Sequence, residues 1–212
     1  MFRYLASQTK TNICCHVDHG YTLDECYEGI DSGFTSVMFD GSKLTLKENI
    51  KISKKIASRA HKYNISIEGE IGFVGYDNGK ISEGTNIEDA VTFANQSNID
   101  AMAISVGNTH LQTSKKASID FNKINLIEAK TKIPLVLHGS SGIPVEQRKK
   151  LARKTKVAKL NIGTEIRMTF GEALRKNLKN NPKTYDRLQL LKPTIKDLTK
   201  VTKKIIKQIG PN

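Results

Sequence analysis

Short apolar runs that end abruptly in polar residues, each followed by a stretch with helical spacing, constrain the fold of this chain more than any other feature. Val, Ile and Leu dominate several of these runs, as is typical of strands buried on both faces. Such strand–helix alternation predicts parallel βαβ units. Six runs of this kind can be recognised, at 13–19, 36–40, 65–71, 101–106, 133–138 and 157–162.

The stretches between the runs carry the usual signals of helix boundaries. Thr22 and Glu25 match a capping box, and Thr45 and Glu48 repeat it. Pro144 is typical of a first helical position. The α/β class follows. A TIM (β/α)8-type barrel is one closed solution, incomplete here because only about six of eight βα units are present, in one partial barrel domain over residues 1–212. The expected helices are 22–31, 45–62, 86–96, 120–131, 144–155, 164–179 and 194–209.

The net charge of +13 admits two explanations. Residues 172–212 hold eleven Lys or Arg against three acidic residues. The first explanation is that this segment is a basic tail that binds nucleic acid. The same segment, however, has an apolar stripe at helical spacing, which indicates that its Lys residues line the solvent face of a packed helix. We therefore expect no nucleic-acid partner, although a positive field attracts anions such as phosphates. The stripe consists of Ile195, Leu198, Val201, Ile205 and Ile209.

Cellular location is constrained by what the sequence lacks. No run of about 18 apolar residues occurs, so no membrane span is expected. Residues 1–10 lack the apolar region of a secretion signal. Cys14, Cys15 and Cys26 are odd in number and irregular in spacing, which argues against a disulfide framework. A cytoplasmic protein is the better expectation.

Polar residues of functional types follow each of the six runs. The carboxyl ends of parallel barrel strands meet on one face, where active sites lie. Three of the five histidines take such positions, namely His19, His110 and His138. A lone histidine is more often structural, but three His with an open fourth position are typical of a catalytic zinc site. Asp18 can join this site only if the strand turns at its end.

The remaining histidines and one loop complete the candidates. His16 shares a strand face with Asp18 and is expected to be a hydrogen-bonded interior residue, whereas His61 lies on a helix and is expected at the surface. The segment 138–144, HGSSGIP, offers exposed N–H groups that suit an anion. Asn161 and Thr164 add neutral donors for a phosphate or for hydroxyl groups.

Six ordered segments carry a wider pattern: HVDHG (16–20), GFTSVMFDGS (33–42), IEGEIG (67–72), DAMAISVGNTH (100–110), PLVLHGSSGIP (134–144) and KLNIGTE (159–165). Taken in order, from about residue 13 to the end, they resemble the class II fructose- or tagatose-bisphosphate aldolases. The resemblance implies a barrel enzyme, an aldehyde-lyase, that acts on a phosphorylated sugar as a homo-oligomer, either a dimer or a tetramer.

The resemblance also implies roles for single residues. His19, His110 and His138 correspond to the ligands of one catalytic Zn²⁺ per chain, and Glu70 to an acidic position that holds the metal in an alternative place. Asp18 corresponds to the catalytic acid/base. The groups that hold the substrate phosphate and hydroxyls would be Gly139, Ser141, Gly142, Asn161 and Thr164.

The implied reaction is the reversible cleavage of fructose 1,6- or tagatose 1,6-bisphosphate to dihydroxyacetone phosphate and glyceraldehyde 3-phosphate. Gly163, in Asn-Ile-Gly-Thr, resembles the tagatose-type branch more than the branch with Asp there. The two substrates differ only in the configuration of one hydroxyl, so both stay open.

Several departures from the family pattern leave a second hypothesis open. Family members carry two further βα units upstream, so a complementing N-terminal fragment is an additional candidate partner. The loop VGYDNG at 74–79 lacks the family's catalytic Glu, with Asp77 as the nearest acid. Leu111 replaces the Gly that usually follows the second zinc histidine, and 155–159 lacks a hinge Gly. The alternative is a truncated, catalytically inactive zinc-binding remnant of the family.

Overall fold

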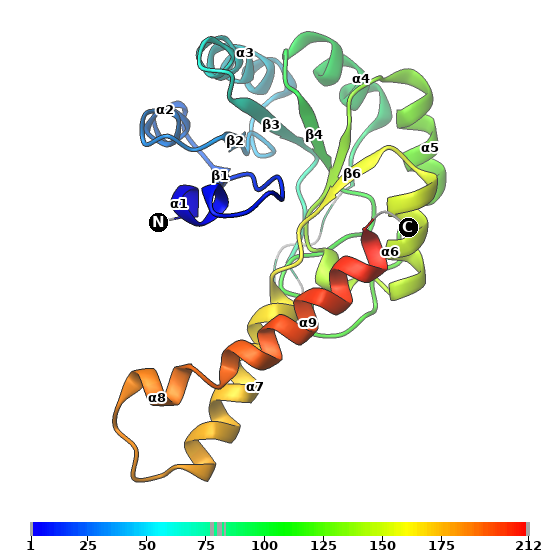
Figure 1. Cartoon of the computed structure of the whole chain (residues 1–212). Coiled ribbons are helices and arrows are strands. Elements are labelled where there is room, and N and C mark those ends of the chain that lie inside the picture. Colours follow the sequence, from blue (N-terminus) through cyan, green and yellow to red (C-terminus); the bar gives the residue numbers. More distant parts are fainter. Residues whose placement is uncertain (1, 77–78, 80–81, 83, 211–212) are drawn as a thin grey trace.

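The computed structural model describes residues 2–76, 79, 82 and 84–210. In this part of the chain, six parallel strands form one sheet in sequence order, β1-β2-β3-β4-β5-β6. The sheet curls into part of a barrel with helices on its outer side (Figure 1), which confirms the predicted α/β class and incomplete barrel. The strands are β1 (His16–Gly20), β2 (Ser36–Phe39), β3 (Ser66–Ile71), β4 (Ala101–Ile104), β5 (Leu135–Leu137) and β6 (Val157–Leu160).

The helices lie where the sequence predicts them, with three short additions. The 6-residue α1, the 5-residue α8 and the 3-residue 3-10 helix η1 carry too few residues for a visible period. No helix among the described residues has the length and apolar character needed to cross a bilayer. The helical elements are α1 (Phe2–Ser7), α2 (Leu23–Asp31), α3 (Leu46–Lys62), α4 (Ile87–Gln96), α5 (Phe121–Lys130), η1 (Ser140–Gly142), α6 (Val145–Lys154), α7 (Thr164–Asn180), α8 (Arg187–Leu191) and α9 (Thr194–Ile209).

Helix starts follow the predicted capping chemistry. Thr22 accepts a hydrogen bond from the backbone N–H of Glu25 at 3.2 Å, and the Glu25 carboxylate accepts from the Thr22 N–H at 3.1 Å. Thr45 and Glu48 form the same box before α3. Pro144 stands one residue earlier than predicted, as the N-cap of α6. The two capping boxes satisfy N–H groups that the first helical turn leaves free.

Each central strand buries both faces, as the apolar runs predict. The outer row packs against the helices, and Gly69 in β3 lets the Phe93 ring of α4 approach, since a Cβ there would lie 2.8 Å from that ring. The inner row holds a small apolar cluster of Met38, Ala103 and Val136. In register, Glu68 pairs with Met38 and Glu70 with Ala103. Two carboxylates of β3 therefore point into the barrel interior.

The C-terminal helices form an arm that projects from the barrel, with α9 returning beside α7 toward α6 (Figure 1). Most of the predicted apolar stripe of α9 is covered, and Ile205 is 5% exposed. Ile195 is an exception, being 60% exposed at the far end of the arm. The prediction that Ile195 packs was wrong, because helical spacing shows which face is apolar but not how far a neighbouring helix covers it.

Candidate metal centre and substrate pocket

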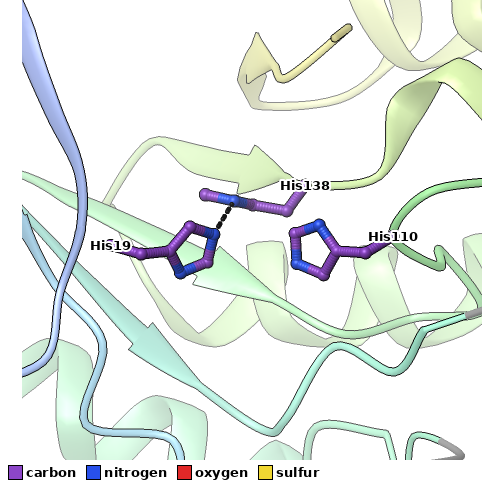
Figure 2. Close-up of side chains that lie close together, drawn as sticks. All are labelled: His19, His110 and His138. Atoms are coloured by element: carbon purple, nitrogen blue, oxygen red, sulfur yellow. Dashed lines mark hydrogen bonds between the residues drawn. The ribbon is translucent and has the colours of Figure 1, made fainter. Parts of the chain in front are cut away.

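Three imidazoles from separate stretches of chain meet at the carboxyl-terminal edge of the sheet (Figure 2). His19 lies near the end of β1, His110 follows β4, and His138 directly follows β5. Each ring offers one nitrogen, and these three atoms all lie within 4.8 Å of one another. The closest approach joins His138 Nδ1 and His19 Nε2 at 3.0 Å.

The geometry and chemistry of this triad fit a transition-metal ion. Nitrogens bound tetrahedrally to zinc at about 2.0–2.1 Å lie roughly 3.3 Å from each other, so only small movements would close the set. Burial first, and then the charges of His138 and His19, lower the pKa of His110 to about 4. The His110 ring is therefore neutral near pH 7 and keeps the lone pair that a metal requires.

A local turn in β1 brings two adjacent side chains to one site. His19 has a left-handed backbone with φ of 57°, and the register with β2 shifts between Val17 and Gly20. Asp18 and His19 would point to opposite faces of a regular strand. Because of this irregularity, Asp18 and His19 both line the same pocket. This is the turn at the strand end that, judged from the sequence, Asp18 needs in order to join the site.

A second group of potential ligands adjoins the triad and includes Glu70. His19 Nδ1 lies 2.9 Å from Asp40 Oδ2 and 3.9 Å from Glu70 Oε2. Glu70 Oε2 is buried and has no hydrogen-bond partner among the described residues. Burial, and then the charge of Asp40, raise the pKa of Glu70 well above its ordinary value. A buried oxygen without a partner is costly, and a cation beside it would remove that cost.

Asp40 behaves in the opposite way from Glu70. Its burial favours the neutral acid, but hydrogen bonds from His19 and Ser42 outweigh that effect and lower the pKa of Asp40. Ser42 Oγ donates to Asp40 Oδ1 at 2.6 Å. Asp40 therefore stays ionised and holds the His19 ring from the side away from His138.

The triad opens into a pocket of about 190 Å³ that also contains most of the predicted substrate-binding residues. Asn161 Nδ2 donates to Asp18 Oδ1 at 3.2 Å. Gly142 does not line this pocket and lies against the side chain of Gln112 instead. The lining residues are Asp18, His19, Tyr76, His110, Leu111, His138, Gly139, Ser141, Asn161, Gly163, Thr164 and Arg167.

The glycine–serine loop is held against the first turn of α7. Gly139 has φ of 62°, and a Cβ on it would collide with the Thr109 carbonyl oxygen, so the position accepts only glycine. Ser141 Oγ accepts from the Glu165 N–H at 3.1 Å. The fully buried Arg148 donates through Nη2 to the Ser141 carbonyl and to the Glu165 carboxylate, both at 2.7 Å. Loop and helix start thus form one rigid wall of the pocket.

Comparison with known proteins places this architecture in a family. The chain matches the profile of "Fructose-bisphosphate aldolase class-II" over residues 1–212. The chain belongs to the class II aldolase family. The resemblance noted in the sequence is therefore confirmed, as are the fold and the enzyme class that it implies.

Relatives of this class II aldolase chain carry more than one substrate name. It is 36% identical over 201 residues to the 6-phospho-5-dehydro-2-deoxy-D-gluconate aldolase of Shouchella clausii (strain KSM-K16), covering 93% of this chain and 68% of that protein. It is 33% identical over 202 residues to the fructose-bisphosphate aldolase of Staphylococcus aureus (strain Mu50 / ATCC 700699), covering 93% and 70%. The chain thus spans about two thirds of the length of these relatives.

Solved structures of similar fold agree with this placement. The YdjI aldolase of Escherichia coli K12 superposes with a TM-score of 0.80 at 27% identity, covering 98% of this chain and 73% of that one. A putative fructose-1,6-biphosphate aldolase from Coccidioides immitis gives a TM-score of 0.81 at 22% identity, covering 98% and 75%, which shows the shared fold alone.

Besides Gly163, three lining residues of the pocket were not predicted as binding groups. Tyr76 stacks on His110 with ring centroids 5.1 Å apart. Arg167 Nη2 lies 3.3 Å from Thr164 Oγ1, one helical turn away, a spacing that could have identified it. Leu111 is left-handed with φ of 58°, a conformation that glycine adopts without strain, and its side chain is 54% exposed at the pocket. Asp77 lies outside the described residues.

The other two histidines lie as predicted. His16 is half-buried, with Nδ1 2.8 Å from Ser36 Oγ and Nε2 3.2 Å from Lys159 Nζ. His61 is on the outer surface, with Nε2 3.0 Å from Asp100 Oδ2. Burial, and then the charge of Lys159, lower the pKa of His16 to about 4.

His16 gives the stability of the protein a definite pH dependence. The ordinary pKa of 6.5 applies to the unfolded chain, which therefore binds a proton at higher pH than the folded chain does. The free energy of unfolding should fall as pH decreases from about 6.5 to about 4. Replacing His16→Gln should reduce the loss between pH 7 and pH 5 by about 1 kcal/mol, allowing for partial solvent screening. Urea unfolding of both proteins at the two pH values measures this, and an equal loss in the variant would contradict it.

Proposed function

We propose that this chain carries the catalytic centre of a zinc-dependent aldolase that reversibly cleaves a phosphorylated ketose. The observation that carries the proposal is the convergence of His19, His110 and His138 on a pocket that also contains Asp18. Three imidazole donors with an open side are the ligand set of catalytic zinc. Family membership supports the reaction class, because class II aldolases perform this cleavage with a metal.

Metal binding and proton transfer are carried out by different residues of the site. His19, His110 and His138 would hold the zinc, and Glu70 offers an alternative ligand beside His19. Zinc when bound polarises the substrate carbonyl and stabilises negative charge that develops beside it. Asp18, whose carboxylate is 58% exposed and lines the pocket, takes the proton from the hydroxyl on the far carbon of the scissile bond, which becomes the aldehyde carbon, and returns it in the condensation direction.

Asn161 and the opposite wall of the pocket position the substrate. The Asn161 amide orients the Asp18 carboxylate and remains close to the His138 ring. Gly139, Ser141 and Thr164 supply neutral groups for a phosphate. Arg167, in the first turn of α7, adds a permanent positive charge among the described lining residues. This end of the pocket suits the phosphate of dihydroxyacetone phosphate.

The identity of the other half of the substrate separates the candidates. Fructose 1,6- and tagatose 1,6-bisphosphate end in a second phosphate, whereas the substrate named in the Shouchella relative, 6-phospho-5-dehydro-2-deoxy-D-gluconate, ends in a carboxylate. All three place a ketone next to a phosphorylated carbon, and cleavage beyond that ketone gives the same three-carbon phosphate. We propose that the pocket recognises this shared part of the substrate, the ketone and its neighbouring phosphate.

The quaternary arrangement belongs to the same proposal. We infer a cytoplasmic enzyme whose single partial barrel domain assembles as a homodimer or homotetramer. Strands β1 and β6 are the two edges of the sheet, so a polypeptide supplying further βα units could complete the barrel there. Light scattering of the purified chain, alone and with such a fragment, measures both arrangements.

An assay with and without a chelator tests the function. The zinc-loaded protein is given each of the three substrates, and release of dihydroxyacetone phosphate is followed with a coupled dehydrogenase. We expect cleavage of at least one substrate, its loss on removal of zinc with a chelator, and its recovery on adding zinc back. Activity that persists in demonstrably metal-free protein would overturn the metal mechanism. Tight zinc binding without any turnover would favour the alternative, a catalytically inactive zinc-binding remnant.

A further inference from the structure

A buried carboxylate of β3 holds the most deeply buried of the three histidines. Glu68 lies in the inner row of β3 and is 3% exposed, while His138 is 1% exposed. Glu68 Oε1 lies 2.8 Å from His138 Nε2. The other oxygen, Oε2, accepts from Lys159 Nζ of β6 at 2.6 Å. Oε1 thus has a partner directly after β5, and Oε2 has one on β6.

These contacts specify which nitrogen of His138 carries the proton. An ionised carboxylate only accepts hydrogen bonds, so Nε2 must be the N–H that faces Glu68. Nδ1 then keeps its lone pair, and Nδ1 is the atom that lies 3.0 Å from His19 Nε2 at the triad. Neutral imidazole donates from only one nitrogen, so the contact on one side of the ring determines what the other side can bind.

We propose that Glu68, held in place by Lys159, is the positioning residue that fixes the tautomer and ring orientation of His138 for the metal. The inference rests on the proposed zinc centre and adds a specific role within it. Glu68 and Lys159 do not line the substrate pocket, so they act through His138 and not on the substrate. Carboxylates that orient a ligating imidazole in this way raise its affinity for the metal.

A chain of contacts keeps Glu68 from turning away. Lys159 Nζ also lies 3.2 Å from His16 Nε2, and His16 Nδ1 lies 2.8 Å from Ser36 Oγ. An ammonium can only donate, so His16 accepts through Nε2 and donates through Nδ1 to Ser36. The interior polar chain therefore runs from β2 through β1, β6 and β3 to His138, and every member has a directed partner. Lys159 supplies the charge that keeps the Glu68 carboxylate pointing inward.

Zinc affinity, measured against a chromophoric chelator, tests this role without relying on activity. Glu68→Gln keeps the size of the side chain but can present an N–H₂ to His138 and no longer attracts Lys159. We expect a 10- to 100-fold loss of zinc affinity, the range found when such partners are removed. The matched control is Asp100→Asn, because Asp100 makes the same contact with His61, at 3.0 Å, on the outer surface. That control should bind zinc as the wild type does.

A second measurement reports the tautomer directly. Long-range ¹H–¹⁵N NMR spectra of the histidine rings in metal-free protein should show the Nε2–H form of His138 in the wild type, with His138 assigned by elimination after single replacement of each of the other four histidines. In Glu68→Gln the His138 signals should shift toward a mixture of forms. A wild-type His138 that is protonated at Nδ1, or a variant with unchanged tautomer and zinc affinity within twofold, would overturn the role of Glu68.

A third variant keeps the test decisive if Glu68→Gln fails to fold. Lys159→Met leaves the carboxylate in place but removes its anchor, and it should also lower zinc affinity, by less than the glutamine variant. An unchanged affinity in a folded Lys159→Met protein would then overturn the proposal. If the wild type itself binds no zinc, the metal centre and the role of Glu68 fall together, whereas wild-type binding with insensitive variants rejects the role of Glu68 alone.

Discussion

Replacing His110 with alanine is expected to remove tightly bound zinc and to reduce aldol cleavage to the background rate. Removing one of three imidazoles leaves two protein ligands, too few for a catalytic zinc site. His110 is the best of the three to replace, because it stands in a loop after β4 and is only partly buried. His138 is buried against Glu68, so its loss would also disturb folding. Metal content per chain and the cleavage rate are the two measurements.

The control for this prediction is a histidine outside the site. His61→Ala removes a 38%-exposed imidazole of α3 and should keep full zinc content and activity. Circular dichroism and thermal unfolding of the metal-free proteins show whether both variants fold like the wild type. One zinc per chain in a folded His110→Ala protein, bound as tightly as before, would show that the triad is not the metal centre.

Much of the architecture could be predicted because it depends on short-range patterns. Six strands could be predicted from apolar runs with abrupt polar ends, because a strand that is buried on both faces needs apolar side chains at nearly every position. The starts of two helices could be predicted from Thr22 and Thr45, because their capping hydrogen bonds join residues only three positions apart. The grouping of His19 with His138 also followed from topology, because parallel strands bring their carboxyl ends to the same edge.

What the sequence could not show depends on register between distant strands. Glu68 and His138 are 70 residues apart, and their contact exists only because β3 and β5 are aligned across β4 with both side chains on the inner row. An acidic residue in a strand gives no sign of which distant imidazole it will contact. Gly142 is a residue whose place in a family motif wrongly predicted a place in the pocket. It lies in η1 and faces Gln112 instead of lining the pocket.

Replacing Asp18 with asparagine is expected to lower kcat by about 10²–10⁴-fold while zinc stays bound, the range for loss of a general base. Asparagine has the same shape and can still accept the hydrogen bond that Asn161 donates at 3.2 Å, so the pocket should keep its form. It cannot take up a proton from the substrate hydroxyl. The rate at saturating substrate and the zinc content of the same sample separate a lost base from a lost metal.

The matched control for Asp18 is Asp24→Asn, an exposed aspartate in the first turn of α2 outside the pocket. It should keep wild-type kcat with at most a small loss of stability from the weakened interaction with the helix dipole. A folded, zinc-loaded Asp18→Asn enzyme with kcat within about threefold of the wild type would show that another group moves the proton. Loss of zinc in that variant would instead place Asp18 among the groups that support the metal, because His138 Nδ1 lies only 4.0 Å from its carboxylate.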